Sequence, residues 1–300
     1  MQGLWQRLEG ETETRMMEIK PFGHRDIPAA LNLCAQVNWN HLEADWNRCL
    51  ALNPDACLGG FEDGALKATC TLTPFGTIGW VGTFLVDQSL RGKGHGKRLF
   101  EAMLETARKQ GIACLGLDSS DAGRPIYLQY GFQMTGEGIE LWTWPTNGDA
   151  DPHEAARPLQ DSDWASLLAF DQARVQVPRA QQLRMLAGEP GTSVRVIMTN
   201  GTLCGFGFSR PGRLSGAIGP VVARDTPTAC RIVSALLADR AHLDGAKAVA
   251  LAIPDNDPFK AWLAGLGFQM RRRNIRMFRP EIRSILSGPS VFATTGLGMG

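Results

Sequence analysis

The residues best suited to chemistry form a short run of glycines and cations near the end of the first third of the chain. The run reads Arg91-Gly92-Lys93-Gly94-His95-Gly96-Lys97. An apolar stretch of strand length, residues 81–86, precedes it, and apolar residues recur at helical spacing over residues 98–108. Glycines at the start of a helix let the backbone approach a ligand closely, and the unpaired N–H groups of the first turn point toward it. The pattern therefore predicts a strand, a phosphate-binding loop and a helix, with a merely flexible turn as the alternative.

The spacing of the glycines distinguishes between the known phosphate loops. In a P-loop Ser or Thr follows the Gly-Lys pair, whereas Arg98 follows Gly96-Lys97 here. A dinucleotide loop has the form Gly-x-Gly-x-x-Gly, and Gly96 comes one residue too early for it. The form Arg-Gly-x-Gly-x-Gly after a strand instead resembles the pyrophosphate loop of the GCN5-related N-acetyltransferases (GNATs), which bind acetyl-coenzyme A. The resemblance implies that the cofactor is held by Arg91, Gly92, Lys93, Gly94, His95, Gly96 and Lys97, with His95 as a spacer.

The other predicted elements follow in the order typical of that family. Two helices come first, then a hairpin that turns at Asp63-Gly64, then the strand, loop and long helix, and then a strand at residues 114–118. A short helix follows that carries Tyr127 and ends at Gly131-Phe132. The resemblance therefore covers residues 17 to about 145.

The second half of the chain repeats the landmarks of the first. Asp63-Gly64 returns as Asn200-Gly201 and Gly131-Phe132 as Gly267-Phe268, at offsets of 137 and 136 residues. A repeat this long indicates a duplicated domain and not a solenoid unit. We predict an α/β fold of two GNAT-like domains, each a mixed, mostly antiparallel sheet flanked by helices. The expected limits are a polar N-terminal segment 1–16, a first domain 17–145, a linker 146–154, a second domain 155–282 and a C-terminal tail 283–300.

The second half lacks the residue types that the chemistry would need. Residues 227–232 stand opposite the glycine loop and contain no glycine, and Leu263 stands opposite Tyr127 and has no proton to give. We therefore predict that this half does not transfer acetyl groups. It resembles the degenerate C-terminal half of a subset of tandem acetyltransferases, in which an intact domain comes first. The apolar, glycine-rich end from Ile285 to Gly300 fits either pairing with a sheet edge or a loose tail.

The family resemblance implies that an amine attacks the thioester carbonyl directly, with no covalent enzyme intermediate. Main-chain groups of Phe84, Leu85 and Val86, where the family's strand splays, would contact the pantetheine arm and polarise the carbonyl. One well-placed donor of this kind contributes about 3 kcal/mol. Tyr127 lies five residues before Phe132, where the family places the tyrosine that returns a proton to the thiolate. The alternative role of Tyr127 is to pack the short helix against the sheet.

The general base and the acceptor pocket are less sharply indicated. Asp118 ends its strand beside the expected cofactor cleft and is the first candidate for the base, with capping of the next helix as the alternative. Asp45 is the second candidate, unless it is only a solvated surface residue. Trp39, Asp45 and Trp46 would form an amine pocket by cation–π and charge attraction, unless the tryptophans only cover the sheet. Ser120 is an expected cofactor contact, weakened because the family has an asparagine there.

The overall composition narrows the classes of partner. Of the 300 residues 44% are hydrophobic, which is enough for a core of normal size. Basic and acidic residues nearly balance, 31 to 30, so no net field favours nucleic acid or a membrane surface. Seven scattered cysteines without metal-ligand spacing indicate reduced thiols and no metal. Residues 1–11 lack an apolar signal core and no apolar run approaches the length of a membrane span, so we expect a cytoplasmic protein.

Together these patterns predict an N-acetyltransferase that moves an acetyl group from acetyl-CoA to a primary amine of a small molecule, in the N-terminal domain. No nucleic acid, membrane or metal partner is expected, and a homodimer stays open. One alternative is a non-catalytic acyl-CoA-binding or regulatory module, because a fold does not guarantee an activity. Another is an acetyltransferase that acts on a protein amine.

Overall fold

The computed structural model describes residues 16–145, 156–239, 246, 248–281, 283 and 285–299. Residues 16–145 are called the first half below, and those from 156 onward the second half. The first half contains β1 (Glu18–Pro21), α1 (Ile27–Gln36), α2 (Glu43–Leu52), β2 (Cys57–Glu62), β3 (Ala65–Phe75), β4 (Ile78–Val86), α3 (His95–Lys109), β5 (Cys114–Ser119), α4 (Arg124–Gln129) and β6 (Gln133–Pro145). Short 3-10 turns, at His24–Asp26, Pro54–Ala56 and Gln88–Leu90, connect some of these elements.

The second half repeats this order of elements. It contains β7 (Arg157–Pro158), α5 (Trp164–Val175), α6 (Ala180–Ala187), β8 (Ser193–Thr199), β9 (Thr202–Arg210), β10 (Gly216–Ala223), α7 (Thr226–Ala238), β11 (Ala248–Pro254), α8 (Asp257–Gly265) and β12 (Gln269–Arg279). A 3-10 turn lies at Asp161–Asp163, and a final strand, β13 (Val291–Ala293), has no counterpart in the described part of the first half. The repeat that the sequence predicted is therefore a repeat of structure.

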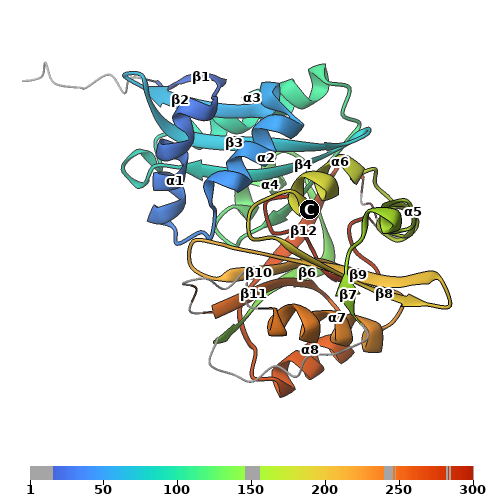
Figure 1. Cartoon of the computed structure of the whole chain (residues 1–300). Coiled ribbons are helices and arrows are strands. Elements are labelled where there is room, and N and C mark those ends of the chain that lie inside the picture. Colours follow the sequence, from blue (N-terminus) through green and yellow to red (C-terminus); the bar gives the residue numbers. More distant parts are fainter. Residues whose placement is uncertain are drawn as a thin grey trace, which may run out of the picture.

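Within the described residues, thirteen strands form one mixed, mostly antiparallel sheet. Its order is β1-β2-β3-β4-β5-β12-β6-β11-β10-β9-β8-β7, and β13 pairs with β10. Figure 1 shows the two halves as two lobes that meet along this sheet, with helices packed on its faces. The predicted fold class, α/β with mostly antiparallel pairing, is confirmed.

Helices cover both faces of the sheet in the first half. The apolar stripe of α3 buries Leu99, Phe100 and Met103 against one face, as its helical spacing predicts. On the other face α1 and α2 bury Leu33 and Trp46 in a separate hydrophobic cluster. The sheet between these layers carries the residues of the candidate site.

The hydrophobic core is continuous between the halves. Trp80 and Cys114 of the first half share a cluster with Phe206 and Phe278 of the second. The rings of Trp80 and Phe278 meet edge to face, with centroids 5.9 Å apart. The two halves are therefore packed as one body.

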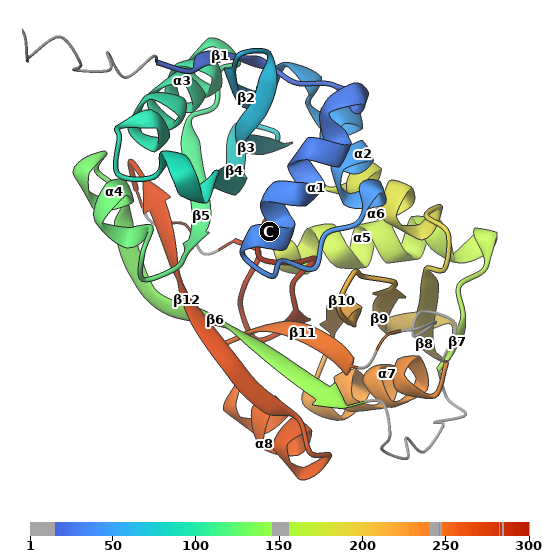
Figure 2. The same ribbon diagram turned by 90° about the vertical axis from the view of Figure 1, so that its left-hand side faces the viewer.

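The halves exchange their last long strands. β6, from the first half, pairs with β11 of the second half, and Trp144 lies opposite Val249. β12, from the second half, pairs with β5 of the first, and Arg276 lies opposite Asp118. Figure 2 shows β6 and β12 running side by side through the centre of the molecule, where they pair with each other. Each half thus completes the sheet of the other, so a limit near residue 150 divides the sequence but not the folded sheet.

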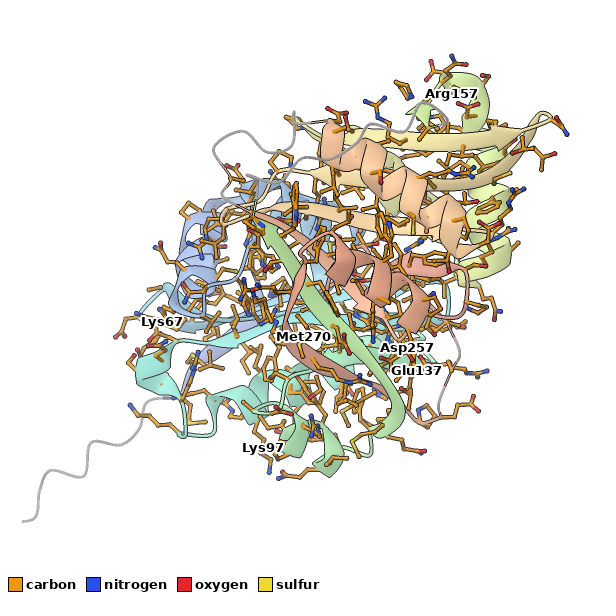
Figure 3. The ribbon with its side chains drawn as sticks, turned by 90° about the horizontal axis from the view of Figure 1, so that it is seen from below. Lys67, Lys97, Glu137, Arg157, Asp257 and Met270 are labelled. Carbon is orange, nitrogen blue, oxygen red and sulfur yellow. The ribbon has the colours of Figure 1, made fainter. Side chains whose placement is uncertain are left out.

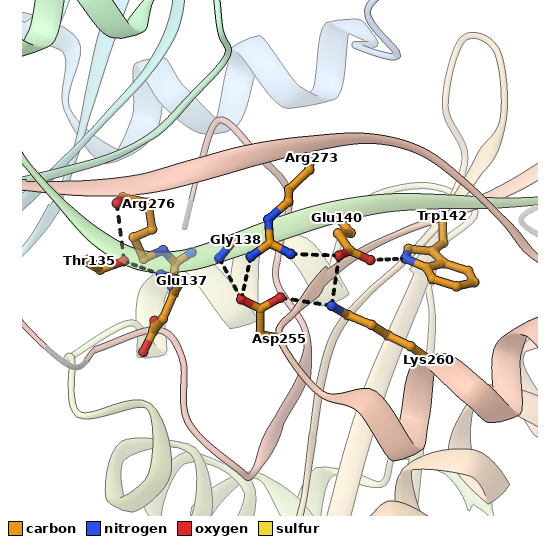
Figure 4. Close-up of polar contacts among 9 residues, drawn as sticks. All are labelled: Thr135, Glu137, Gly138, Glu140, Trp142, Asp255, Lys260, Arg273 and Arg276. Carbon is orange, nitrogen blue, oxygen red and sulfur yellow. Dashed lines mark hydrogen bonds and ion pairs between the residues drawn. The ribbon is translucent and has the colours of Figure 1, made fainter.

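A network of ion pairs joins the elements at this exchange (Figure 4). Glu140 of β6 contacts Lys260 of α8 and Arg273 of β12, each at 3.0 Å. Asp255, directly after β11, pairs with the same two cations at 2.9 and 2.8 Å and accepts a hydrogen bond from the Gly138 N–H. The side chains of Lys260 and Glu140 are each only 11% exposed. Because the pairs are shared among four side chains, and the Lys260–Glu140 pair is largely shielded from water, the network stabilises the exchanged strands more than isolated surface pairs would.

The cysteines are part of the core. All seven are free thiols and six of them are buried. Burial raises the pKa of Cys49 to about 11, so this thiol stays protonated and unreactive at neutral pH. Among the described residues no group of three or more His, Cys, Asp or Glu side chains is placed to hold a metal ion. No described helix has the length and apolarity needed to cross a membrane.

Candidate functional site

β4 and β5 separate from each other in the middle of the sheet of the first half. They pair in parallel only as far as Trp80 opposite Gly116. Beyond that pair β4 continues to Val86 and β5 to Ser119, with no pairing between them. The outer edges of both strands remain paired, β4 with β3 and β5 with β12. The result is an opening in the strand pairing between β4 and β5, called the wedge below, where the main-chain groups on the two facing edges lack a strand partner.

A β-bulge lies on β4 beside this opening. The register of β3 and β4 shifts between Thr69 opposite Leu85 and Thr71 opposite Gly82, which leaves one extra residue on β4. Thr83 sits in this bulge with φ +43°, a strained value for a β-branched residue. The Thr69 hydroxyl donates to the Thr83 carbonyl at 2.8 Å, and the Thr71 and Thr83 hydroxyls are also 2.8 Å apart. These buried hydroxyl contacts hold the bulge in place.

The glycine loop and the start of α3 lie at the end of β4. Gly92 and Gly94 have φ of +76° and +83°, which other residues rarely adopt. A Cβ at either glycine would meet no protein atom within 4 Å, so the space beside the loop is open. α3 begins at His95, and its N-terminal end carries partial positive charge. Three exposed cations surround it, Arg91, Lys93 and Lys97, and Figure 3 shows Lys97 on the outer side of the first half.

His95 is the buried member of this loop. Its side chain is 2% exposed, and neither ring nitrogen has a hydrogen-bond partner among the described residues. It is therefore enclosed at the start of α3, and its spacer role stays a prediction. A Cβ placed on the neighbouring Gly96 would lie 3.5 Å from side-chain atoms of Phe84 and Val86. The start of α3 therefore packs directly on β4.

Tyr127 borders the opening from α4. Its ring belongs to an aromatic cluster, with centroids 6.3 Å from Phe84, 5.2 Å from Phe100 and 6.0 Å from Phe132. The residue is 8% exposed. Burial, and to a smaller extent the Cys70 thiol, raises the pKa of Tyr127 above its ordinary value, so the phenol keeps its proton. The residue thus packs the short helix, and its role as a proton donor stays a prediction.

Asp118 does not have the environment predicted for a general base. Its side chain is fully buried and receives two hydrogen bonds from Arg276, at 3.0 Å from Nε and 3.2 Å from Nη2. Burial raises the pKa of this carboxyl against the lowering effect of Arg276. A carboxylate enclosed in this way cannot reach an amine, which corrects the catalytic role predicted for Asp118. The residue instead fixes β12 to β5.

Ser120 begins the turn that leads into α4. Its hydroxyl accepts from the Gly123 N–H at 3.3 Å, and its carbonyl accepts from the Arg124 N–H at 3.0 Å. Ser120 itself is exposed. The predicted cofactor contact of Ser120 stays a prediction, since its hydroxyl already serves this turn.

The two predicted pocket tryptophans differ in exposure. Trp46 is completely buried, and its ring meets Phe22 edge to face at 5.6 Å. It therefore belongs to the core under α1 and α2, which corrects its predicted place in an amine pocket. Trp39 is half-buried and stacks on His41, with ring centroids 5.5 Å apart.

Asp45 is tied into a charged network between the halves. Its carboxylate accepts from Arg48 Nη2 at 2.5 Å and from the Leu42 N–H at 2.9 Å, and Arg210 Nε lies 3.8 Å away. Arg48 also pairs with Glu189 of the second half. Burial raises the pKa of Asp45, but Arg210 and Arg48 lower it by more, so its pKa lies below the ordinary value. The carboxylate is ionised and already serves Arg48 and the Leu42 N–H, and its predicted part in an amine pocket or as a base stays a prediction.

His41 stands in the sequence beside the residues predicted for the acceptor side, but no chemical role was predicted for it or for the C-terminal tail, and the structure brings the two together. The Nδ1 atom of His41 is buried without a hydrogen-bond partner, and burial lowers the pKa of the ring below its ordinary value of 6.5. A Cβ placed on Gly298 would lie 3.9 Å from His41 Nε2 and 3.5 Å from Thr83 Cγ2. The tail therefore joins His41 to the bulge on β4. No local pattern links residues this far apart in the sequence, although the aromatic residues around His41 pointed to this side of the sheet.

Comparison with sequence families identifies the same kind of domain twice. Residues 25–132 match the family model described as "Acetyltransferase (GNAT) family". Residues 167–286 match the one described as "Acetyltransferase (GNAT) domain". Together the two matches cover more than half of the chain.

Known proteins give the same result over longer stretches. The uncharacterized N-acetyltransferase YitH of Bacillus subtilis (strain 168) is 21% identical over 220 residues, which is 71% of this chain and 76% of that protein. A protein of Pyrococcus horikoshii, provisionally described as an acetyltransferase, superposes with a TM-score of 0.75 at 18% identity, with both chains covered completely. A tandem GNAT protein from the clavulanic acid biosynthesis pathway superposes with a TM-score of 0.63 at 17% identity, over 87% of this chain and 98% of that one. The structural likeness extends over both halves.

Proposed function

The chain belongs to the GCN5-related N-acetyltransferase family, with a GNAT domain in each half, and from this we propose that the first half transfers an acetyl group from acetyl-CoA to the primary amine of a small molecule. One observation carries the proposal. The unpaired part of β4 contains the bulge at Thr83 and then Phe84, whose ring centroid lies 6.3 Å from that of Tyr127, and the glycine loop packs on Phe84 and Val86 at Gly96. In the second half, residues 227–232 contain no glycine, and Leu263 stands at the position that corresponds to Tyr127.

The donor fits the residues around the wedge. Acetyl-CoA would supply the thioester, and its pyrophosphate would face the N–H groups of residues 91–96 at the positive end of α3. The exposed cations Arg91, Lys93 and Lys97 add charge there. The main-chain groups of Phe84, Leu85 and Val86 that face the opening would contact the pantetheine arm, and one N–H would polarise the carbonyl, with a contribution of about 3 kcal/mol.

Two side chains would move the protons. We assign the general base to His41, because it is uncharged at neutral pH and lies next to the tail that meets the bulge. The amine nitrogen forms its bond to the acetyl carbon and loses a proton to His41, directly or through water, while the bond from that carbon to sulfur breaks. Tyr127 then gives its proton to the sulfur, and the proton held by His41 returns through solvent to the Tyr127 oxygen, which restores both side chains. The reaction is complete without a covalent intermediate on the protein.

A small acceptor is favoured by what surrounds this face of β4. The tail meets the bulge, and the charged network joins Asp45 and Arg48 of α2 to Glu189 and Arg210 of the second half. A bulky protein segment would have to displace the tail and this network, whereas a small amine would not. The free buried cysteines support a reducing compartment, and we place the protein in the cytoplasm on that ground.

A calorimetric titration of the full chain with acetyl-CoA, followed by assays of CoA release with a panel of small amines, tests this function. We expect one binding site per chain and amine-dependent release. Binding without release across the panel would favour the non-catalytic alternative, and release only with peptide amines would favour a protein acceptor. Absence of binding would overturn the assignment.

A further inference from the structure

The second half has an opening like the wedge between β4 and β5, and the C-terminal segment of the chain fills it. β10 and β11 pair in parallel only as far as Ile218 opposite Leu251. Beyond that pair β13 takes the place beside β10. The Thr294 N–H, directly after β13, donates to the Ala252 carbonyl of β11 at 2.8 Å. The segment thus bonds to both strands and closes the opening between them.

The residues that fill this second opening are buried, and the helix that starts beside it is capped by a carboxylate of the chain itself. Val291, Phe292 and Ala293 are buried, and Phe292 packs edge to face on Phe259 at 5.2 Å. The start of α7 is capped by the Asp225 carboxylate, which accepts from the Thr228 N–H at 2.8 Å. The start of α7 therefore has a carboxylate cap, whereas the start of α3 has no side-chain cap. In the second half the chain itself takes up the space that the wedge of the first half leaves open.

From this anchor the tail runs to the first half. Arg179 donates to the Thr295 hydroxyl at 3.3 Å, and Arg210 donates to the Thr295 carbonyl at 3.0 Å. Further along, Met299 is buried, and Arg48 of α2 donates to its sulfur at 3.3 Å. The end of the chain therefore lies between the two lobes (Figure 1). Buried side chains from both halves fix it there.

The tail meets the first half at the bulge of β4. A Cβ on Gly82 would overlap the carbonyl oxygen of Gly298, so only glycine at 82 permits this approach. Gly298 in turn lies beside Thr83 and His41. Gly82 belongs to the face of β4 opposite α3, because its neighbour Val81 packs in the α3 cluster. The tail is thus on the side of the wedge away from α3.

We propose that residues 296–299 form a wall of the acceptor site and limit the girth of the amine that reaches His41 and the bulge. The second half serves as the anchor of this wall through β13. The inference rests on the proposed function, since it names the acceptor side of the same site. It assigns slim, unbranched primary amines as the acceptors, and it gives the degenerate half a role in selection.

Access to His41 tests the wall without any need for turnover. In the full chain, and in a chain that ends after Thr295, the rate of carbethoxylation of His41 by diethyl pyrocarbonate is followed by peptide mass spectrometry. Removal of residues 296–300 should raise this rate by roughly tenfold, because Gly298 no longer stands beside Nε2 and narrows the approach to it. Gly82→Ala should raise it as well, since the new methyl group displaces Gly298. Gly265→Ala, where a Cβ meets no atom within 4 Å, is the matched control and should leave the rate unchanged.

The same chains are assayed with n-butylamine and sec-butylamine. The ratio of kcat/KM for the branched amine to that for the straight one should rise on truncation, while the dissociation constant of acetyl-CoA stays the same. Gly82→Ala in the truncated chain should not change this ratio further, because Gly298, with which the new methyl group would clash, is absent. If the parent acetylates neither amine but His41 still becomes reactive on truncation, the proposed function is weakened and the wall stands. An unchanged His41 rate in both the truncated chain and Gly82→Ala would overturn the inference.

Discussion

Asp118 on β5 and Arg276 on β12 lie opposite each other across the exchanged strands, and their fully buried side chains form a two-point ion pair. Arg276 also donates to the Leu286 carbonyl at 2.8 Å and lies over the Trp80 ring at 4.7 Å. One guanidinium therefore joins the sheet of the first half, a strand of the second half and the chain leading to β13. The carboxylate that looked most like a catalytic base is thus a structural residue.

Loss of this arginine should destabilise the whole protein. Arg276→Met leaves the Asp118 carboxylate buried and unpaired, which we expect to lower the free energy of unfolding by about 3–5 kcal/mol, measured by urea denaturation. Asp118→Leu combined with Arg276→Met should recover much of this loss, because no charge remains buried. For Asp118→Asn we expect kcat per folded molecule to be nearly kept. A large fall in kcat with unchanged stability would restore Asp118 as the base.

Tyr127→Phe should separate turnover from cofactor binding. The ring keeps its aromatic contacts with Phe100 and Phe132, so the fold and the dissociation constant of acetyl-CoA should be nearly unchanged. Without the hydroxyl, kcat should fall by about 100-fold, because the leaving sulfur loses its proton donor. Tyr130→Phe is the matched control, since the exposed Tyr130 hydroxyl only donates to Glu101 at 2.9 Å. Equal kcat for both variants and the parent would remove Tyr127 from the mechanism.

The pH dependence of kcat should report on His41. The neutral ring accepts the proton, and burial lowers its pKa below 6.5, so the neutral form predominates at pH 6.5 and is lost only as the pH falls through the lowered pKa. We therefore expect kcat to fall on the acid side with a midpoint below pH 6.5. His41→Gln should lower kcat by about 100-fold and abolish that acid limb. His24→Gln, which alters an exposed contact with Asn47, should change neither quantity. An acid midpoint above 6.5 would contradict the assignment.

Gly94→Val should abolish acetyl-CoA binding. Gly94 has φ +83° and precedes the first turn of α3, so a branched side chain both strains the loop and blocks the approach of a pyrophosphate. Gly64→Val provides the matched control, because Gly64 has φ +80° in a hairpin turn with no atom within 4 Å. Both variants should lose similar stability, but only Gly94→Val should lose affinity in calorimetry. Intact affinity in Gly94→Val would mean that the loop is only a turn.

The amino-acid sequence by itself determined the family, the repeat and the parts of the site that depend on neighbours in the chain. The glycines at 92 and 94, the helix after them and Tyr127 in its short helix are local signals, because turns, caps and helical periods involve residues a few positions apart. The degeneracy of the second half was equally visible, since it consists of missing residue types at aligned positions.

Only the tertiary structure decided which side chains are free to act. Asp118 and Arg276 are 158 residues apart, and no spacing rule brings such residues together. The exchange of β6 and β12 follows from which strand edges remain unpaired after both halves fold, and that depends on the whole sheet. The approach of Gly298 to Gly82 likewise depends on β13, whose pairing with β10 fixes the start of the tail in the second half. Contacts between distant segments arise from packing, so the sequence could offer Asp118 as a candidate base but could not reveal its buried partner.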